Sequence, residues 1–381
     1  MNKPLLSIAI ATKDREKYCI AAIQSILSYK ATNIEIAIAD NSETTLVKEF
    51  VEKLNSTQVK YRYDSGGVSS IENFNRAVEL TTGEYLILIG DDDIILPKAI
   101  EMAKWAKEND IDSICSKETV TYYWPKSRTI YPNGHLILPY STGRITKIDV
   151  KKHLVKLLKN GLQLYLLYPL PKTYHGIVRK ALMDEVKSKT GHYYGGLSPD
   201  IYSCVVMSCL VKNHYVVDEP LTVAGVCPSS TTADNFTGKH SGSIANIPHL
   251  KNRGVYVWNN LVPKYYSVNT IWAESGLTAL EELKQTILLN DFNVYKLLVQ
   301  GWINNNKFIP DLIREENEKI RISLQTSIII FKFNFFKALS ETVIKKIIHV
   351  VQGKLRRKAV FAQDNVRDFS EVLAIYRNNI K

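Results

Sequence analysis

Residues 5–89 alternate between short apolar runs and stretches in which apolar residues recur at helical spacing. The apolar runs predict strands at 5–12, 33–40, 59–63 and 84–89, and the stretches between them predict helices at 18–29, 46–54 and 69–80. Strand and helix therefore take turns along the chain, which is typical of βαβ units. We predict an α/β fold with a mostly parallel sheet and helices on both faces.

Polar residues follow three of these predicted strands, at positions 12–15, 40–42 and 91–93. In a parallel sheet the carboxyl ends of the strands meet at one edge, and ligands bind in the crevice beyond that edge. We therefore expect these loops to converge on a single site.

Three consecutive aspartates, Asp91, Asp92 and Asp93, stand between two apolar segments. Burying an unpaired carboxylate costs several kcal/mol, so something must compensate the charge. One interpretation is a solvated turn before the helix predicted to begin near Pro97. The other is a site for a hard divalent cation and a phosphorylated nucleotide. No GxGxxG follows the first strand and no GxxxxGK[ST] occurs, which argues against dinucleotide oxidoreductases and P-loop NTPases.

Three ordered segments resemble the inverting, nucleotide-sugar-dependent glycosyltransferases of family 2, which have the GT-A fold: "LSIAIATKDREKYCIAAIQSIL", "IEIAIADNS" and "NFNRAVELTTGEYLILIGDDDIILP". The resemblance covers about the first 235 residues of the sequence. It implies a Rossmann-like GT-A sheet and sugar transfer from a nucleotide-diphosphate donor, a UDP-sugar above all. It also implies Mn²⁺ or Mg²⁺ as cofactor, and a glycan or lipid-linked acceptor in surface polysaccharide biosynthesis.

Carried over by position, the resemblance assigns two groups of residues. The donor nucleotide is bound by Thr12, Asp14, Arg15, Asp40, Asn75 and Asp91, and the metal by Asp92 and Asp93. The sequence departs from the family pattern where Asp14 replaces the usual Asn, where Phe74 replaces an Arg, and where Gly90 replaces the first acid of the metal motif. These departures leave open which two of the three aspartates bind metal, and we favour Asp92 as the chief ligand.

Inverting transfer also needs a general base for the acceptor hydroxyl, and the resemblance assigns this role to Asp200. Pro199 stands where the family usually has Glu. The alternative is that Ser198 caps a helix, Pro199 begins it, and Asp200 only supplies a favourable charge at its N-terminus.

Other polar and aromatic residues give weaker signals. His175 is a candidate acceptor-side residue, and His192 and His240 are candidate third metal ligands, although a lone His is more often structural. The loop at 227–243 is either a lid or a linker. Residues 115–139 predict a hairpin turning at 132–134, whose Tyr122, Tyr123 and Trp124 are expected in the core or against an acceptor sugar.

The chain of 381 residues has a formal net charge of +11, and much of the excess lies in residues 321–358, where nine Lys or Arg accompany one acid, Glu341. We predict a glycosyltransferase domain at 1–245, with a nucleotide-binding half at 1–105 and an acceptor-binding half at 106–245. A helical region follows at 246–381. Its basic amphipathic segment either lies on an anionic membrane or packs on protein, and nucleic acid is not expected.

Five scattered cysteines, no apolar run of membrane-spanning length and no secretory signal predict a cytoplasmic protein, either free or peripheral on the inner face of the membrane. Two other functions stay open: a nucleotidyltransferase, which also uses paired aspartates but usually carries a Gly-rich phosphate loop, and a non-catalytic sugar- or partner-binding relative.

Overall fold

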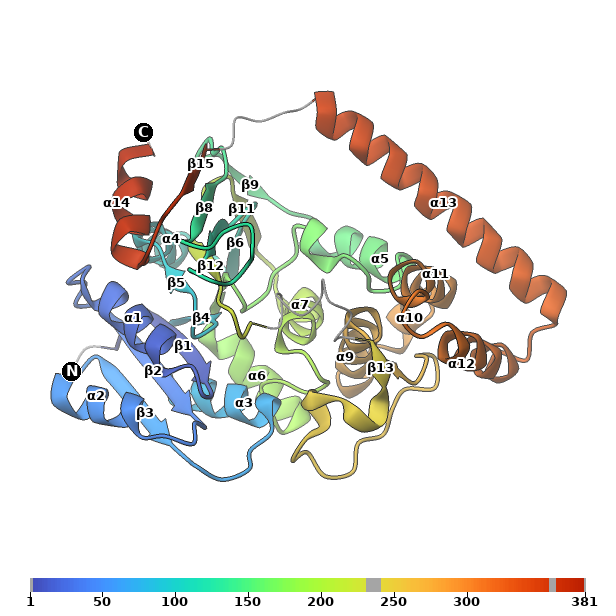
Figure 1. Ribbon diagram of the computed structural model, residues 1–381, viewed down its shortest axis with the longest axis horizontal. Coiled ribbons are helices and arrows are strands. Elements are labelled where there is room, and N and C mark those ends of the chain that lie inside the picture. The colour runs from blue at the N-terminus through green and yellow to red at the C-terminus, as the bar shows by residue number, and fades with distance from the viewer. Residues whose placement is uncertain (1–2, 231–240, 356–360, 380–381) are drawn as a thin grey trace.

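The computed structural model describes residues 3–230, 241–355 and 361–379. Its centre is an eight-stranded sheet in the order β3-β2-β1-β4-β10-β6-β11-β9, in which all strands except β10 and β9 run in the same direction (Figure 1). These strands are β1 (Leu6–Thr12), β2 (Ile34–Asp40), β3 (Val59–Tyr63), β4 (Tyr85–Ile89), β6 (Ser113–Ser116), β9 (Ile145–Lys147), β10 (Gly176–Arg179) and β11 (His214–Val217). The prediction of a mostly parallel sheet is confirmed.

Side-chain size separates the two faces of this sheet. In β1 and β2, isoleucines point to the face covered by α1 (Glu16–Leu27), α2 (Leu46–Leu54) and α4 (Pro97–Glu108). The alternating alanines Ala9 and Ala39 point to the other face, where α3 (Ser70–Glu79) packs. Because successive strand residues point to opposite faces, the repeated "IAIA" produces a bulky face and a small-residue face.

The other helices come later in the chain. They are α5 (Val150–Lys159), α6 (Lys180–Thr190), α7 (Pro199–Leu210), α9 (Val268–Glu282), α10 (Thr286–Leu289), α11 (Val294–Asn305), α12 (Pro310–Ser323), α13 (Ile328–Leu355) and α14 (Phe369–Asn379). Helices α7 and α9 pack against each other and share one hydrophobic cluster with the sheet face that α3 covers. The core therefore extends across position 245, and a domain boundary there stays a prediction.

A five-stranded sheet lies beside the main one, in the order β15-β8-β7-β12-β5. It contains β5 (Ile94–Ile95), β7 (Val120–Tyr123), β8 (His135–Leu138), β12 (Thr222–Val226) and β15 (Phe361–Asp364), while β13 (Gly242–Ser243) pairs separately with β14 (Tyr265–Tyr266). Strands β7 and β8 are antiparallel, so the predicted hairpin is confirmed. Tyr122 and Trp124 are buried, as expected for core residues.

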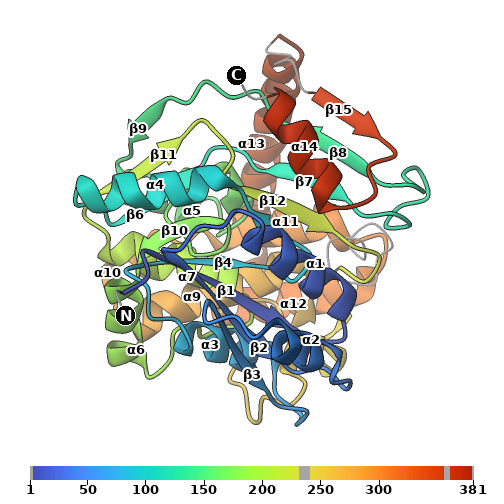
Figure 2. The same cartoon turned by 90° about the vertical axis from the view of Figure 1, so that its left-hand side faces the viewer.

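The end of the chain returns to its beginning. Helix α13 runs along one edge of the molecule, away from the central sheet, and β15 and α14 then lie beside β8 and near α1 (Figures 1 and 2). The sequence predicted only helices in this region, because the short β15 becomes a strand through pairing with β8, more than two hundred positions earlier. Among the described helices, none has both the length and the hydrophobicity to cross a bilayer.

Candidate active site

The carboxyl ends of β1 and β2 lie side by side, and Thr12 pairs with Asp40 in the strand register. The side-chain amide of Asn73 on α3 donates to the carbonyls of Thr12 and Ala39, both at 3.1 Å, and so ties the helix to both strand ends. The Asp40 carboxylate accepts hydrogen bonds from the Ser42 backbone N–H at 2.9 Å and from the Tyr61 hydroxyl at 2.6 Å. The structure thus fixes Asp40 at this edge.

The loop after β1 meets the aspartate triplet after β4. Thr12 donates from its hydroxyl to Asp91 at 2.8 Å, and Arg15 donates from Nη1 to the other oxygen of Asp91 at 3.0 Å. The same Arg15 atom lies 3.7 Å from Oδ1 of Asp92, and Arg15 Nη2 donates to the Ser229 carbonyl at 2.5 Å. Four of the predicted site residues, Thr12, Arg15, Asp91 and Asp92, therefore form one contact network.

Asp93 points into the protein. Its Oδ1 accepts from the backbone N–H of Gly225 at 2.7 Å, and its Oδ2 accepts from the backbone N–H of Gly90 at 2.7 Å and from the Tyr174 hydroxyl at 3.1 Å. His175 Nε2 lies 3.3 Å from the same Oδ2, and burial lowers the pKa of His175 to about 3, so this imidazole is neutral. Asp93 is therefore a buried acceptor that is held by several hydrogen-bond donors.

Gly225 of β12 brings a second backbone against the triplet. A Cβ at this position would lie 1.7 Å from the Asp92 carbonyl oxygen, so only glycine allows the strand to approach this closely. Asp92 accepts two further hydrogen bonds. The backbone N–H of Cys227 donates to Asp92 Oδ2 at 3.0 Å, and the Trp124 indole N–H donates to the Asp92 carbonyl at 3.2 Å.

The three carboxylates are nearly buried and face one strong counter-charge, Arg15, within the described part of the chain. Burial, opposed by Arg15, raises the pKa of Asp91 to about 6, and burial together with the charge of Asp93 raises the pKa of Asp92 to about 6. Burial likewise raises the pKa of Asp93 to about 6. The edge therefore holds more negative charge than its protein neighbours compensate, and a cation would be attracted there.

Carboxylate oxygens are ligands that suit a divalent cation. Among those of the triplet, Oδ1 of Asp92 is best placed to bind one. Arg15 lies 3.7 Å from Oδ1 of Asp92, beyond hydrogen-bonding distance, whereas both oxygens of Asp91 and of Asp93 accept hydrogen bonds. No group of three or more His, Cys, Asp or Glu side chains in the described ranges is arranged to hold a metal ion. Mg²⁺ bound together with a nucleotide commonly takes only one or two carboxylates, with phosphate oxygens and water as the other ligands.

Asp200 lies in the first turn of α7, with Ser198 as N-cap and Pro199 as the first helical residue. Ser198 thus has the N-cap position of the alternative interpretation, although its side chain makes no capping hydrogen bond. Burial, followed by the negative charge of Asp93, raises the pKa of Asp200 to about 6, and a hydrogen bond with Tyr165 opposes the shift. Asp200 therefore lies within electrostatic range of Asp93.

Two predicted donor residues bind elsewhere. Asp14 is exposed, with φ of 54°, and its carboxylate accepts from the Glu43 N–H at 2.8 Å, which ties the first loop to the second. The Asn75 amide donates to the carbonyls of Ile71 and Tyr194, both at 2.9 Å, and accepts from the N–H groups of Tyr193 and Tyr194. Asn75 therefore uses its hydrogen-bonding groups to join α3 to the 193–194 backbone.

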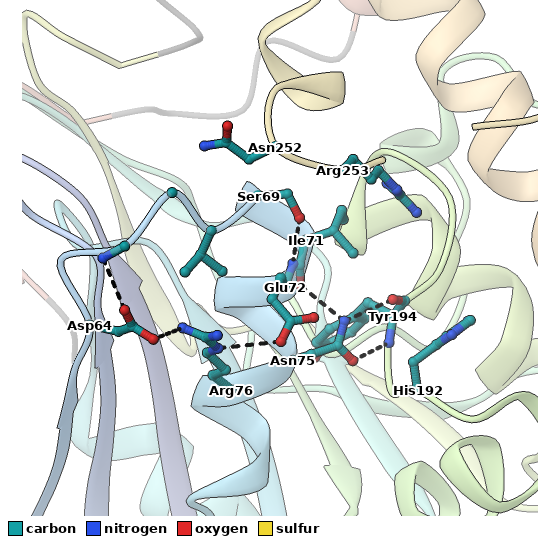
Figure 3. A pocket seen from close by; sticks show the side chains of 13 residues that line it. Asp64, Ser69, Ile71, Glu72, Asn75, Arg76, His192, Tyr194, Asn252 and Arg253 are labelled. Atoms are coloured by element: carbon teal, nitrogen blue, oxygen red, sulfur yellow. Dashed lines mark hydrogen bonds and ion pairs between the residues drawn. The ribbon is translucent and has the colours of Figure 1, made fainter. Parts of the chain in front are cut away.

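Asn75 also lines a polar pocket of about 580 Å³ between α3 and the segment at 252–253 (Figure 3). Arg76 crosses one side of this pocket between Asp64, at 2.7 Å, and Glu72, at 3.3 Å. His192, on the other side, contacts Glu282 at 3.0 Å. His240 and most of the 227–243 loop fall outside the described residues, so the metal-ligand and lid predictions made for them stay predictions.

Sequence reasoning did not find Gly225, Cys227, Tyr174 or Asn73. The one available signal for Gly225 was its position inside the apolar stretch "LTVAGV", because a glycine within a strand often marks a close backbone approach. The other contacts use backbone N–H groups or single polar side chains that no spacing pattern identifies.

Residues 7–153, which contain β1 to β4 and the whole triplet, match the family model described as glycosyl transferase family 2. The chain contains a family 2 glycosyltransferase domain. The matched range holds all the predicted nucleotide- and metal-binding residues of this glycosyltransferase domain, and Asp200 lies beyond it.

Several curated proteins resemble the glycosyltransferase domain. A putative colanic acid biosynthesis glycosyl transferase of Escherichia coli, WcaA, is 29% identical over 150 residues, which are 37% of this chain and 52% of that protein. The abequosyltransferase RfbV of Salmonella typhimurium is 26% identical over 113 residues, which are 28% of this chain and 34% of that protein. Chondroitin synthase of Escherichia coli is 25% identical over 153 residues, 39% of this chain and 22% of that protein.

The chain thus spans about half, or less, of the length of these curated relatives. Among solved structures, residues 1–349 of S. aureus TarS in complex with UDP-GlcNAc align with a TM-score of 0.45 and 14% identity, over 88% of this chain and 80% of that chain.

Proposed function

We propose that this protein transfers a sugar from a nucleotide-diphosphate donor to a glycan or lipid-linked acceptor in surface polysaccharide biosynthesis, with inversion at the anomeric carbon. The observation that carries the proposal is the network of Thr12, Arg15, Asp91 and Asp92 at the strand ends of a family 2 glycosyltransferase domain. The names of two relatives, a colanic acid biosynthesis glycosyl transferase and an abequosyltransferase, support the same class of product.

The donor is proposed to be a nucleotide-diphosphate sugar, and we favour a UDP-sugar. Its nucleotide is proposed to lie over the loops after β1 and β2. Thr12 and Asp40 are adjacent there, and a hydrogen bond to Asp91 holds the Arg15 side chain in place. Asp14 and Asn75 support the surrounding loops in the structure, so their proposed part in donor binding is to keep those loops in place.

A bound Mn²⁺ or Mg²⁺ would supply charge stabilisation for the departing nucleoside diphosphate. Asp92 offers Oδ1 to such an ion, and Asp93 would share an oxygen that already accepts protein hydrogen bonds. Arg15 adds a fixed positive charge beside the same position.

Asp200 is the proposed general base. It takes the proton of the acceptor hydroxyl as the hydroxyl oxygen bonds to the anomeric carbon, while the bond from that carbon to the diphosphate breaks and the diphosphate keeps the electron pair. A carboxylate with a pKa near 6 is a stronger base than an exposed aspartate and is still largely ionised at neutral pH.

The segment around Tyr165 exposes apolar side chains. Tyr165, which hydrogen-bonds Asp200, begins a short 3-10 helix (Tyr165–Leu167) whose Leu166 and Leu167 are 59% and 66% exposed. The preceding Leu164 is also exposed. Exposed leucines in a row beside a proposed base favour an acceptor with an apolar part, such as a lipid-linked sugar.

Helix α13 is proposed to contact an anionic membrane surface. Phe331, Ala338 and Thr342 face the protein, whereas the opposite side of the helix exposes Ile329, Phe333, Phe336, Ile344 and Ile347. Lys332 and Lys337 are exposed beside this stripe. An apolar stripe with flanking lysines is the pattern of a helix that lies in the plane of an anionic bilayer.

The proposal is tested by titrating UDP-, GDP-, CMP- and dTDP-sugars with and without Mn²⁺ or Mg²⁺, and by following donor hydrolysis. We expect metal-dependent binding of one donor class. The variant Asp92→Asn should lose the metal-dependent part of this binding by tenfold or more, because a neutral amide binds a divalent cation far less well. Unchanged metal-dependent binding in Asp92→Asn would remove Asp92 as the ligand, and binding of no nucleotide sugar would remove the proposed function.

A further inference from the structure

The last described segment of the chain, residues 361–379, is built into the fold beside the active site; we call it the C-terminal clasp. Its strand β15 pairs with β8 from Phe361 opposite Leu138 to Asp364 opposite His135. The chain then turns tightly around Gly134, because Asn365 donates to the Gly134 carbonyl at 3.0 Å and a Cβ on Gly134 would lie 1.9 Å from the Val366 carbonyl oxygen.

The clasp places one aromatic ring in the core under the hairpin. Phe369, at the start of α14, is 1% exposed, and its ring centroid lies 4.7 Å from that of Trp124 in an edge-to-face arrangement. The Tyr122 ring lies 5.7 Å away, and the Tyr122 hydroxyl donates to the Val366 carbonyl at 3.1 Å. Trp124 thus packs against a residue that lies 245 positions further along the chain.

Trp124 in turn holds the backbone of the triplet. Its indole N–H donates to the Asp92 carbonyl at 3.2 Å, and its backbone N–H donates to the Val226 carbonyl at 3.1 Å, next to Gly225 and Cys227. Tyr18 of α1 also packs against the same indole, with centroids 4.9 Å apart. The Trp124 ring is therefore in contact with both α1 and the clasp.

We infer that the C-terminal clasp positions Asp92 for cation and donor binding, through packing of Phe369 on Trp124 and the hydrogen bond from Trp124 to the Asp92 carbonyl. This inference rests on the proposed function. Phe369 and Trp124 are positioning residues, since neither is placed against the donor. A hydrogen bond to a main-chain carbonyl fixes the direction of the Asp92 side chain, because rotation of that peptide would also move the carboxylate.

The test uses the full chain with three substitutions. Trp124→Phe keeps a ring and removes the indole N–H, and Phe369→Leu reduces the contact with Trp124. Tyr376→Leu is the matched control, an aromatic-to-leucine change two turns further along α14, where the residue is also buried and lies near the acids Glu101 and Glu219. Circular dichroism and thermal unfolding check that each variant is folded.

Two measurements are made on each variant. Hydrogen exchange of the peptide at 86–97 is followed in the metal-free protein, and Mn²⁺ is titrated calorimetrically in the presence of UDP. We expect faster exchange in this peptide and about fivefold weaker Mn²⁺ binding in Trp124→Phe and in Phe369→Leu, the effect of one lost hydrogen bond. The double variant should be no weaker than the worse single variant, because both changes break the same chain of contacts.

Tyr376→Leu should match the wild type in both measurements. If Trp124→Phe also matches the wild type in both, or if Tyr376→Leu shifts them as much as Phe369→Leu does, the inference is overturned. Failure of the proposed function looks different: the wild type itself would take up no Mn²⁺ with UDP, while the exchange measurement would still show whether the clasp orders residues 86–97.

Discussion

Asp200 and Asp311 occupy the same position in their helices, since each follows a proline in the first turn, Asp200 in α7 and Asp311 in α12. Their surroundings differ. Asp200 is partly buried near Tyr165, and its pKa is raised to about 6, whereas the Asp311 side chain is 87% exposed and pairs with Arg314 at 2.7 Å. The comparison separates an exposed charge at a helix N-terminus from a carboxylate whose pKa is raised, which is the property that our proposal requires of a general base.

We predict that Asp200→Asn keeps donor binding and lowers the transfer rate by about a hundredfold or more, because the amide cannot accept a proton. In the wild type the rate should rise as pH increases through about 6, where Asp200 loses its proton, or through a lower pH when a cation lies nearby. Rates of product formation between about pH 5 and about pH 8 measure both effects. Asp311→Asn is the control; equal losses in the two variants would make Asp200 a helix-terminus charge only.

A second prediction at this scale concerns Gly225. Gly225→Ala should weaken metal-dependent donor binding and lower the free energy of unfolding by roughly 1–3 kcal/mol, because the new Cβ would overlap the Asp92 carbonyl oxygen. Gly242→Ala is the matched control, since a Cβ at Gly242 meets nothing within 4 Å. Denaturant titration and calorimetry give the two quantities, and a Gly225→Ala protein as stable as Gly242→Ala would contradict the close approach.

At the scale of elements, α13 is the helix whose two sides differ most in their surroundings. One side is fixed to α11 by the buried Lys296, which reaches the Ala338 carbonyl at 3.0 Å and Glu341 at 2.7 Å. The other side exposes an apolar stripe to solvent. A helix anchored along one side in this way can offer the stripe to a surface without leaving the protein.

We predict that the wild type floats with vesicles containing anionic lipid and not with neutral vesicles. Replacing Phe333 and Phe336 by Ser should abolish flotation, and Lys332→Glu with Lys337→Glu should weaken it by more than tenfold, since each lysine near the surface contributes about 1 kcal/mol. The control replaces two other exposed residues, Val255 and Val257, by Ser. Flotation that is unaffected by the phenylalanine changes would assign the stripe to a protein partner.

At the scale of the whole molecule, helix α9 shares one hydrophobic cluster with the main sheet, although it lies far along the chain. Glu274 of α9 is 1% exposed, and it accepts hydrogen bonds from the Tyr256 hydroxyl at 3.0 Å and from the Asn259 N–H at 3.1 Å. Burial raises the pKa of this carboxyl from its usual value of 4.5 to about 7.

The folded state therefore binds a proton at Glu274 more tightly than the unfolded chain does. Its contribution to the free energy of unfolding is complete below about pH 4.5 and is lost as pH rises to about 7. Glu274→Gln should remove this pH dependence, which amounts to at most about 3 kcal/mol. Urea unfolding between about pH 5 and about pH 8 measures it, with the exposed Glu108→Gln as control. A slope that persists in Glu274→Gln would assign it to another group.

The sequence by itself determined the strands, helices and strand-end loops of the first hundred residues, because the period of apolar residues reports directly on which side of an element is buried. It also identified Thr12, Arg15, Asp91 and Asp92 as members of one site. Only the tertiary structure decided that Asp93 points inward, that Asn75 holds the 193–194 backbone, and that Gly225 and Trp124 support Asp92. These contacts join residues far apart in the chain through backbone groups and ring edges, which leave no periodic pattern in the sequence.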